Sequence, residues 1–264
     1  MIRSVSCQLE LRVAGPAELV FSVAVARGVP LVTETLRVTS DGAPVTASGL
    51  VAGHGTLLHR LDVGAGTVVL DYAAVAEGLA EPEPVTELDR LSYLRQSRYC
   101  ESDRLAPTAA AEFAGLTGTG LLAAVVDWVH ERIAYVSGSS AGTDSALDTL
   151  LARRGVCRDF AHLAIALLRA LGVPARLASV YAPGLSPMEF HAVCEALVDG
   201  VWWVVDATGR APRRSLLRVA TGRDAADTAF LTSFGAPVEL VGLEVSAVVE
   251  EFILDDQATL TRLR

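Results

Sequence analysis

Residues 153–176 read RRGVCRDFAHLAIALLRALGVPAR, and this stretch has the pattern of a helix that is buried along one side. Its apolar residues recur at intervals of three and four: Phe160, Leu163, Ala164, Leu167, Leu168 and Leu171. Gly172 and Pro174 are typical of the end of a helix. Cys157 therefore stands at the beginning of a helix that is predicted to form part of the core.

The position of Cys157 suggests a chemical role. Unpaired N–H groups and the dipole at a helix N-terminus stabilise a thiolate, which is the nucleophilic form of cysteine. The same N–H groups could hold the oxyanion that forms when a carbonyl is attacked. The alternative is a thiol that only fills space in the core, and position alone favours that alternative.

A second stretch, residues 190–208, reads FHAVCEALVDGVWWVVDAT and predicts a β-hairpin. Asp199-Gly200 is a strong two-residue turn, which fixes the register so that Val198 faces Val201. In this register His191 lies diagonal to Asp206 on one face of the hairpin, close enough for a carboxylate to orient an imidazole. The alternative is a solvated His and Asp on a half-exposed strand.

The neighbours of these residues are assigned from the same pattern. Trp202 shares the face of Asp206 and is a candidate to line a substrate cleft, with packing in the core as the commoner alternative. Cys194 points to the opposite face and is assigned to the core. His162 lies about 140° around the helix from Cys157 and is expected to be a packing residue rather than the base. The chain has no Asn, so the third member of a Cys-His set must be an acid such as Asp206.

The order of the segments predicts an α+β protein. Residues 1–82 contain short Val-, Leu- and Thr-rich segments between turns and are expected to form a small all-β sandwich-like domain. Residues 83–105 are expected to form a linker and a short helix. The linker is indicated by its proline and charged residues, which do not suit the interior of a helix or a sheet. Residues 106–264 are expected to form a core of helices packed on an antiparallel sheet, with carboxy-terminal strands that include residues 237–254.

Composition excludes several functions. The net charge of -9 and the pI near 5.1 argue against nucleic acid as a partner. The chain has neither a signal-peptide pattern nor a long apolar run, so we expect a soluble, cytoplasmic protein without a membrane partner. Its four cysteines form no C-x-x-C pair, and neither a metal nor a cofactor is expected. The oligomeric state is not predicted.

Taken together, the helix beginning GVCRDFAHL and the hairpin FHAV.EALVDGVWWVVDAT resemble the transglutaminase-like superfamily, which has a papain/transglutaminase-like core. The resemblance extends from about residue 97 to residue 230, and residues 1–82 resemble the domain that precedes this core in many bacterial members. It implies that Cys157 is a nucleophile, that His191 is the base and that Asp206 holds His191. In this sequence Val193 and Ala207 replace an aromatic residue and a proline that many members carry.

The resemblance implies acyl transfer on a peptide or protein amide through a thioester. Hydrolysis is the expected outcome, with transfer to a second amine as a variant of the same chemistry. The alternative from another class is a binding or scaffold module that keeps the fold without turnover.

Overall fold

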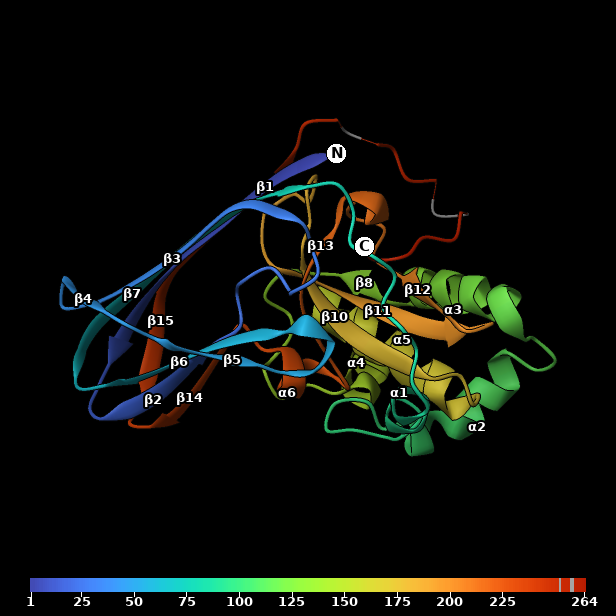
Figure 1. The fold of residues 1–264 in the computed structure, drawn as a ribbon. Helices are drawn as coiled ribbons and strands as arrows, with labels where there is room; N and C mark the ends of the chain where they lie inside the picture. Colours follow the sequence, from blue (N-terminus) through green and yellow to red (C-terminus); the bar gives the residue numbers. More distant parts are fainter. Residues whose placement is uncertain (252, 257–258) are drawn as a thin grey trace.

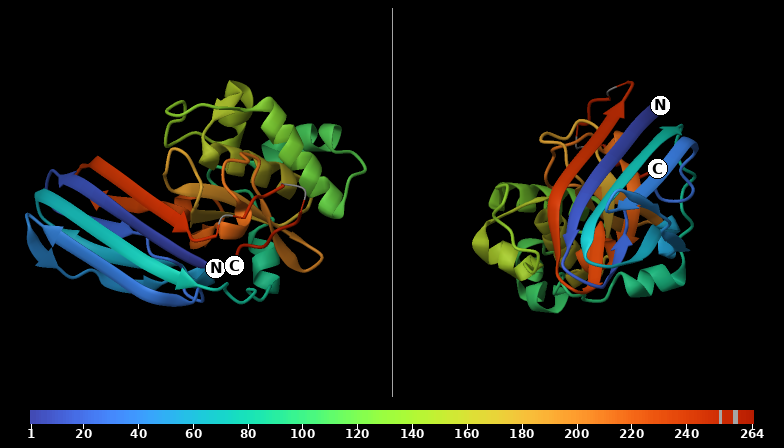
Figure 2. Two further views of the ribbon diagram at one scale, coloured as in Figure 1. Left: turned by 90° about the horizontal axis from the view of Figure 1, so that it is seen from above. Right: turned by 90° about the vertical axis from the view of Figure 1, so that its left-hand side faces the viewer.

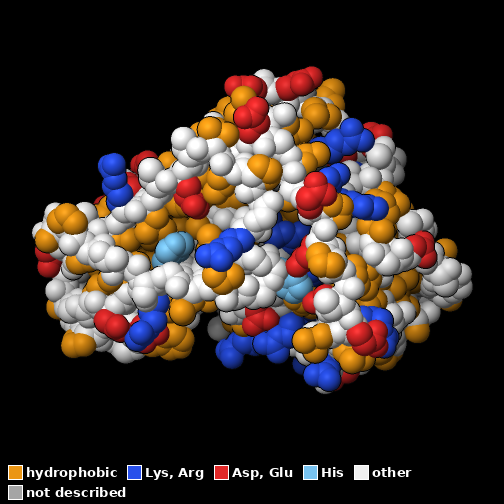
Figure 3. Space-filling model, in the orientation of Figure 1, with side chains coloured by type: hydrophobic (Ala, Val, Ile, Leu, Met, Phe, Trp, Pro, Cys, Tyr) orange, Lys and Arg blue, Asp and Glu red, His pale blue; other side chains and the backbone are white. Residues whose placement is uncertain are grey.

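The computed structural model describes residues 1–251, 253–256 and 259–264. A strand-rich part lies beside a part that contains helices and a sheet (Figure 1). On the face shown in Figure 3, arginine and acidic side chains are interspersed over both parts. Among the described residues, the structure has no helix that is long and apolar enough to cross a membrane.

The strand-rich part consists of two antiparallel sheets that enclose a common apolar core. One sheet has the order β15 (Val238–Val249), β1 (Ile2–Val13), β7 (Gly66–Glu77), β3 (Leu31–Ser40) and β4 (Ala43–Val45). The other has the order β14 (Leu231–Gly235), β2 (Ala17–Phe21), β6 (Leu57–Val63) and β5 (Ser48–Val51), and a short 3-10 turn, η1 (Gly53–Gly55), precedes β6.

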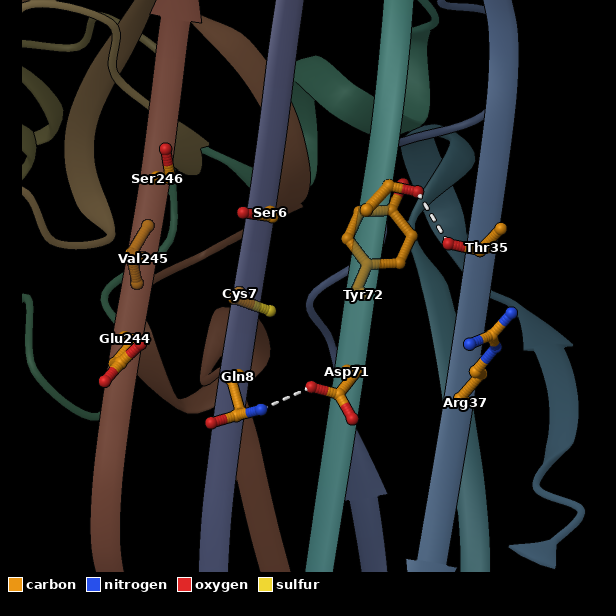
Figure 4. A pocket seen from close by; sticks show the side chains of 11 residues that line it. Ser6, Cys7, Gln8, Thr35, Arg37, Asp71, Tyr72, Glu244, Val245 and Ser246 are labelled. Atoms are coloured by element: carbon orange, nitrogen blue, oxygen red, sulfur yellow. Dashed lines mark hydrogen bonds between the residues drawn. The ribbon is translucent and has the colours of Figure 1, made fainter.

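Alternation along the long strands explains why this part forms a sandwich. In β1, buried and more exposed residues alternate, so one face packs inward and the other faces solvent. Figure 4 shows the outer face, where polar side chains of four neighbouring strands lie side by side and Gln8 donates a hydrogen bond of 2.6 Å to Asp71. The predicted β-sandwich is therefore present.

The last strands differ from our expectation. We assigned them to residues 106–264, but β15 pairs with β1 and β14 pairs with β2, so both ends of the chain build the sandwich (Figure 2). β15 and β1 are both 12 residues long, but a sequence pattern does not show which sheet edge a strand joins. Phe252, in the segment predicted as a strand, lies outside the described residues.

The second part packs helices on one antiparallel sheet of order β12 (Val201–Val205), β11 (His191–Val198), β10 (Ala175–Tyr181) and β13 (Leu217–Gly222). The other elements are α1 (Glu87–Ser92), α2 (Ser102–Glu112), α3 (Gly118–Arg132), β8 (Ala134–Tyr135), α4 (Ala146–Ala152), β9 (Arg154–Gly155), α5 (Cys157–Ala170), η2 (Arg213–Ser215) and α6 (Ala225–Thr228). The buried face of α5 packs against α2, α3, α4 and the sheet. The predicted α+β class is confirmed.

A buried ionic cluster joins the linker to this sheet. The carboxylate of Glu195 on β11 accepts hydrogen bonds from Arg176 on β10, at 2.9 Å, and from Arg218 on β13, at 2.8 Å. Arg176 also donates to Glu83 in the linker at 2.8 Å. Arg176 and Glu195 are each 1% exposed, so each charge depends on its partners for stabilisation.

Candidate active site

The hairpin of β11 and β12 has the predicted turn and register. Asp199 and Gly200 both have positive φ, 52° and 74°, as a two-residue hairpin turn of this kind requires. Val198 pairs with Val201, and the same register continues to the far end of β12. This register brings the first residue of β11 close to the residue that follows β12.

Those two residues are His191 and Asp206, and they form a buried hydrogen bond. The Nε2 atom of His191 lies 3.1 Å from Oδ2 of Asp206. The other carboxylate oxygen, Oδ1, accepts from the backbone N–H of Thr208 at 2.9 Å and from its hydroxyl at 2.7 Å. Burial raises the pKa of Asp206, but the charge and hydrogen bond of His191 and the bonds from Thr208 outweigh it and lower this pKa. The carboxylate is therefore held ionised.

The electrostatics of His191 favour its protonated form. Burial lowers the pKa of His191, but the charge and hydrogen bond of Asp206 raise it, and the neighbouring side chain of Cys157 raises it further. The net effect is a pKa above the ordinary value for histidine. An imidazolium that is oriented by a carboxylate and lies beside a thiol can stabilise the thiolate.

Cys157 is the first residue of α5 and is half-buried. The helix start is held by Asp159, whose carboxylate accepts from the backbone N–H of Val156 at 2.8 Å. Arg158 donates to the other oxygen of this carboxylate at 3.0 Å. These bonds therefore hold the first turn of the helix, and Cys157 lines the same cavity as His191.

Gly155 leaves room for this carboxylate. A Cβ atom at residue 155 would lie 2.7 Å from Cβ of Asp159, closer than real Cβ contacts. We expect Gly155→Ala to lower the free energy of unfolding by about 1–3 kcal/mol, because the first turn of α5 must shift. Urea denaturation measures this loss, with Gly142→Ala as the control, because a Cβ there meets open space. Equal stability of the two variants would contradict the steric argument.

Tyr135 lies on the other side of the helix start and was missed by the sequence analysis. It is opposite Gly155 in the parallel pair of β8 and β9, and its ring lies 4.3 Å from the guanidinium of Arg210. Burial and the charge of Cys157 raise the pKa of Tyr135 to about 12, although Arg210 and a hydrogen bond from the backbone N–H of Cys157 lower it. The phenol therefore sits, un-ionised, at the N-terminus of α5. A single Tyr that follows a helix in the sequence does not indicate a contact with the N-terminus of another helix.

A cavity of about 450 Å³ opens beside Cys157 and His191. Its wall includes residues of the sheet and also Phe230 and Leu231, which lead into the sandwich strand β14. Both parts of the molecule thus contribute to the space in which a substrate would meet the thiol.

The other residues that the sequence singled out lie elsewhere. Trp202 was a candidate to line the cleft, but it lies near the ionic cluster, where its ring is 4.1 Å from the guanidinium of Arg176. Cys194 is fully buried beneath α5, as expected. His162 is buried, stacks on Tyr99 with ring centres 5.4 Å apart, and accepts from the backbone N–H of Ala225 at 3.1 Å. The sequence predicts which face of a strand a side chain lies on, but it does not predict which residues from other elements pack against that face.

Thr208 was also missed, although a local signal exists. An Asp whose side chain accepts from the N–H two residues later forms an Asx-turn, a common arrangement at strand ends and turns. Within residues 1–251, 253–256 and 259–264, no group of three or more His, Cys, Asp or Glu side chains is arranged to hold a metal ion.

Known proteins resemble both the site region and the whole fold. A family model described as "Transglutaminase-like superfamily" matches residues 109–207. The crystal structure of a Cytophaga hutchinsonii protein described as "a Putative Cysteine Protease" has a TM-score of 0.88 and 33% identity, covering 97% of this chain and 92% of that chain. The shared fold therefore includes the sandwich as well as the core.

Curated relatives match shorter segments. An uncharacterized protein of Mycobacterium leprae is 34% identical over 118 residues, which is 40% of this chain and 41% of that protein. An uncharacterized protein of Mycobacterium tuberculosis is 47% identical over 53 residues, 20% of this chain and 17% of that protein. The matches thus span less than half the length of these relatives.

Proposed function

The chain belongs to the transglutaminase-like superfamily, and from this premise we propose that it is a cysteine hydrolase that cleaves an amide of a peptide or protein through a thioester. The observation that carries the proposal is the buried hydrogen bond between His191 and Asp206, with His191 and Cys157 lining the same open cavity. Cys157 is the nucleophile, His191 the general acid and base, and Asp206 the residue that orients His191.

In the first half of the reaction, the thiolate of Cys157 attacks the carbonyl carbon and a C–S bond forms. In the free protein the backbone N–H of Cys157 donates to the hydroxyl of Tyr135; in this step the oxyanion replaces the hydroxyl as the acceptor and receives hydrogen bonds from both groups. His191 gives its proton to the nitrogen of the leaving group, the C–N bond breaks and the amine departs. The acyl group remains on Cys157 as a thioester.

In the second half, His191 takes a proton from water, and the hydroxide attacks the thioester carbonyl. The C–S bond breaks, the carboxylic acid leaves and the thiolate and imidazolium are restored. An amine in place of water would give transamidation by the same steps. A cytoplasmic location stays a prediction, and recovery of the native chain outside the cytoplasm in cell fractionation would contradict it.

Trapping of the thioester tests this proposal. The full chain is mixed with a peptide library, quenched in acid, digested and analysed by mass spectrometry, with a parallel sample that contains an added amine. We expect an acyl group on the peptide that contains Cys157, and free acid as the product when no amine is added. Cys157→Ala serves as the control and should carry no acyl group. A library that is cleaved equally by this variant, or never acylates the protein, would contradict the proposal.

A further inference from the structure

The wall of the cavity beside Cys157 is largely apolar. Its larger apolar side chains are Leu177 on β10, Phe190 just before β11, Phe230 between α6 and β14, and Leu231 at the start of β14; Ala229 also lies in the wall. Apolar walls with a few polar groups are typical of pockets that bury a ligand side chain. The position of this wall next to the thiol makes it a candidate for substrate selection.

Two stacked phenylalanine rings form part of the wall. Phe190 directly precedes His191, and its ring stacks on Phe230 with centres 5.4 Å apart and planes at 19°. Phe190 also packs on Tyr181 of β10, with centres 5.2 Å apart. The carbonyl of Phe230 accepts from the backbone N–H of Ser22 in the sandwich at 3.0 Å. The sandwich therefore fixes one of the two rings, and the catalytic sheet fixes the other.

The charges around the cavity disfavour a charged occupant. Among the described lining residues, the cationic groups are Arg158 and the imidazolium of His191, which is paired with Asp206 at 3.1 Å, and no carboxylate is among them. The guanidinium of Arg158 is already occupied by Asp159 at 3.0 Å and by the hydroxyl of Ser140 at 2.6 Å. A cationic side chain would be desolvated without a partner, and an anionic one would compete with Asp159.

We propose that this cavity binds an uncharged, apolar side chain next to the attacked amide, and that Phe190 and Phe230 determine this specificity. The volume of about 450 Å³ is within the usual range for ligand pockets and accommodates a branched aliphatic or aromatic side chain. The inference rests on the proposed function, because it assigns the substrate class of the same thiol. The proposal also gives the sandwich a role in binding, because part of the pocket wall lies at the start of the sandwich strand β14.

Alkylation of Cys157 tests the pocket without the need for turnover. The reagents are 2-chloroacetamide, N-benzyl-2-chloroacetamide and the anionic N-(chloroacetyl)glycine, and each rate is divided by the rate with glutathione. On the wild-type chain we expect the benzyl reagent to react about tenfold faster than 2-chloroacetamide, because the pocket buries its ring. The anionic reagent should show no such gain.

Two variants decide whether the preference comes from this cavity. Ala229→Trp fills the pocket and should bring the ratio of the two neutral alkylation rates close to one; because both rates are measured on the same variant, the ratio does not depend on the absolute reactivity of the thiol. Ala123→Trp, on the exposed side of α3, is the matched control and should keep the preference. Equal normalised rates for the neutral reagents on the wild-type chain, or a preference that survives Ala229→Trp, would overturn the proposal.

The two proposals fail in different ways. If Cys157 is not a catalytic nucleophile, no peptide acylates the protein, but the ratio of the two neutral alkylation rates still reports on the pocket. If the pocket does not select apolar groups, the ratio is near one, while thioester formation on the peptide library persists.

Discussion

Replacing His191 by alanine is expected to lower the turnover of an amide substrate by about 10⁴-fold or more, because one residue serves as both acid and base. The pKa of His191 is raised by Asp206 and Cys157 despite burial, so the imidazole keeps its proton at neutral pH in the free protein. Without the imidazolium of His191, the thiolate of Cys157 is no longer stabilised by an opposite charge. We therefore also expect slower alkylation of Cys157 by 2-chloroacetamide at pH 6 in His191→Ala, measured by mass spectrometry.

His59→Ala is the control for this prediction. His59 lies on β6 in the sandwich, and its replacement should leave both turnover and alkylation close to the wild-type values. The role assigned to His191 is wrong if His191→Ala, folded by circular dichroism, keeps more than about a tenth of the wild-type turnover.

The largest loss of stability is expected from Glu195→Ala. Removal of this carboxylate leaves Arg176 buried with fewer partners and leaves Arg218 without its closest acid. Breaking a buried ion pair from one side costs about 3–5 kcal/mol, since the remaining charge is desolvated and uncompensated. Denaturation in urea measures the loss. Glu239→Ala is the control, because Glu239 and its partner Arg12 are both 65% exposed and such a pair contributes at most about 1 kcal/mol.

The same cluster predicts a pH dependence. Burial raises the pKa of Glu195, but Arg176 and Arg218 outweigh it and lower the pKa from 4.5 to about 2. A lowered folded-state pKa means that the stabilisation is present above the unfolded value and is lost as the pH falls toward about 2. The difference in unfolding free energy between the wild-type chain and Glu195→Ala should therefore shrink between about pH 5 and pH 2. A difference that stays constant over this range would show that the charge of Glu195 is not the cause.

Local patterns predicted much of the site region. The turn at Asp199-Gly200 has one favoured geometry, so the register and the approach of His191 to Asp206 could be worked out from residue numbers. The apolar stripe of α5 likewise fixed where the helix begins, and hence the place of Cys157. These features depend on contacts within a few residues or across one tight turn.

Features that depend on distant partners were not predictable in the same way. The face of Trp202 was foreseen, but the guanidinium of Arg176 that covers this face belongs to another strand. Tyr135 reaches Cys157 only because β8 and β9 pair in parallel, and two-residue strands have no recognisable pattern. The pairing of β15 with β1 joins residues more than 200 positions apart, which alternation alone does not specify.

That pairing has a consequence for the order of folding. Arg3 is opposite Val249, so the five-stranded sheet cannot be completed during synthesis until Val249 has left the ribosome. Contacts this far apart in sequence close slowly, because the loop entropy is lost before the contacts form. Phe230 and Leu231 reach their places only as β14 docks on β2. A nascent chain can therefore contain the nucleophile and its helix before the wall of the pocket beside it exists.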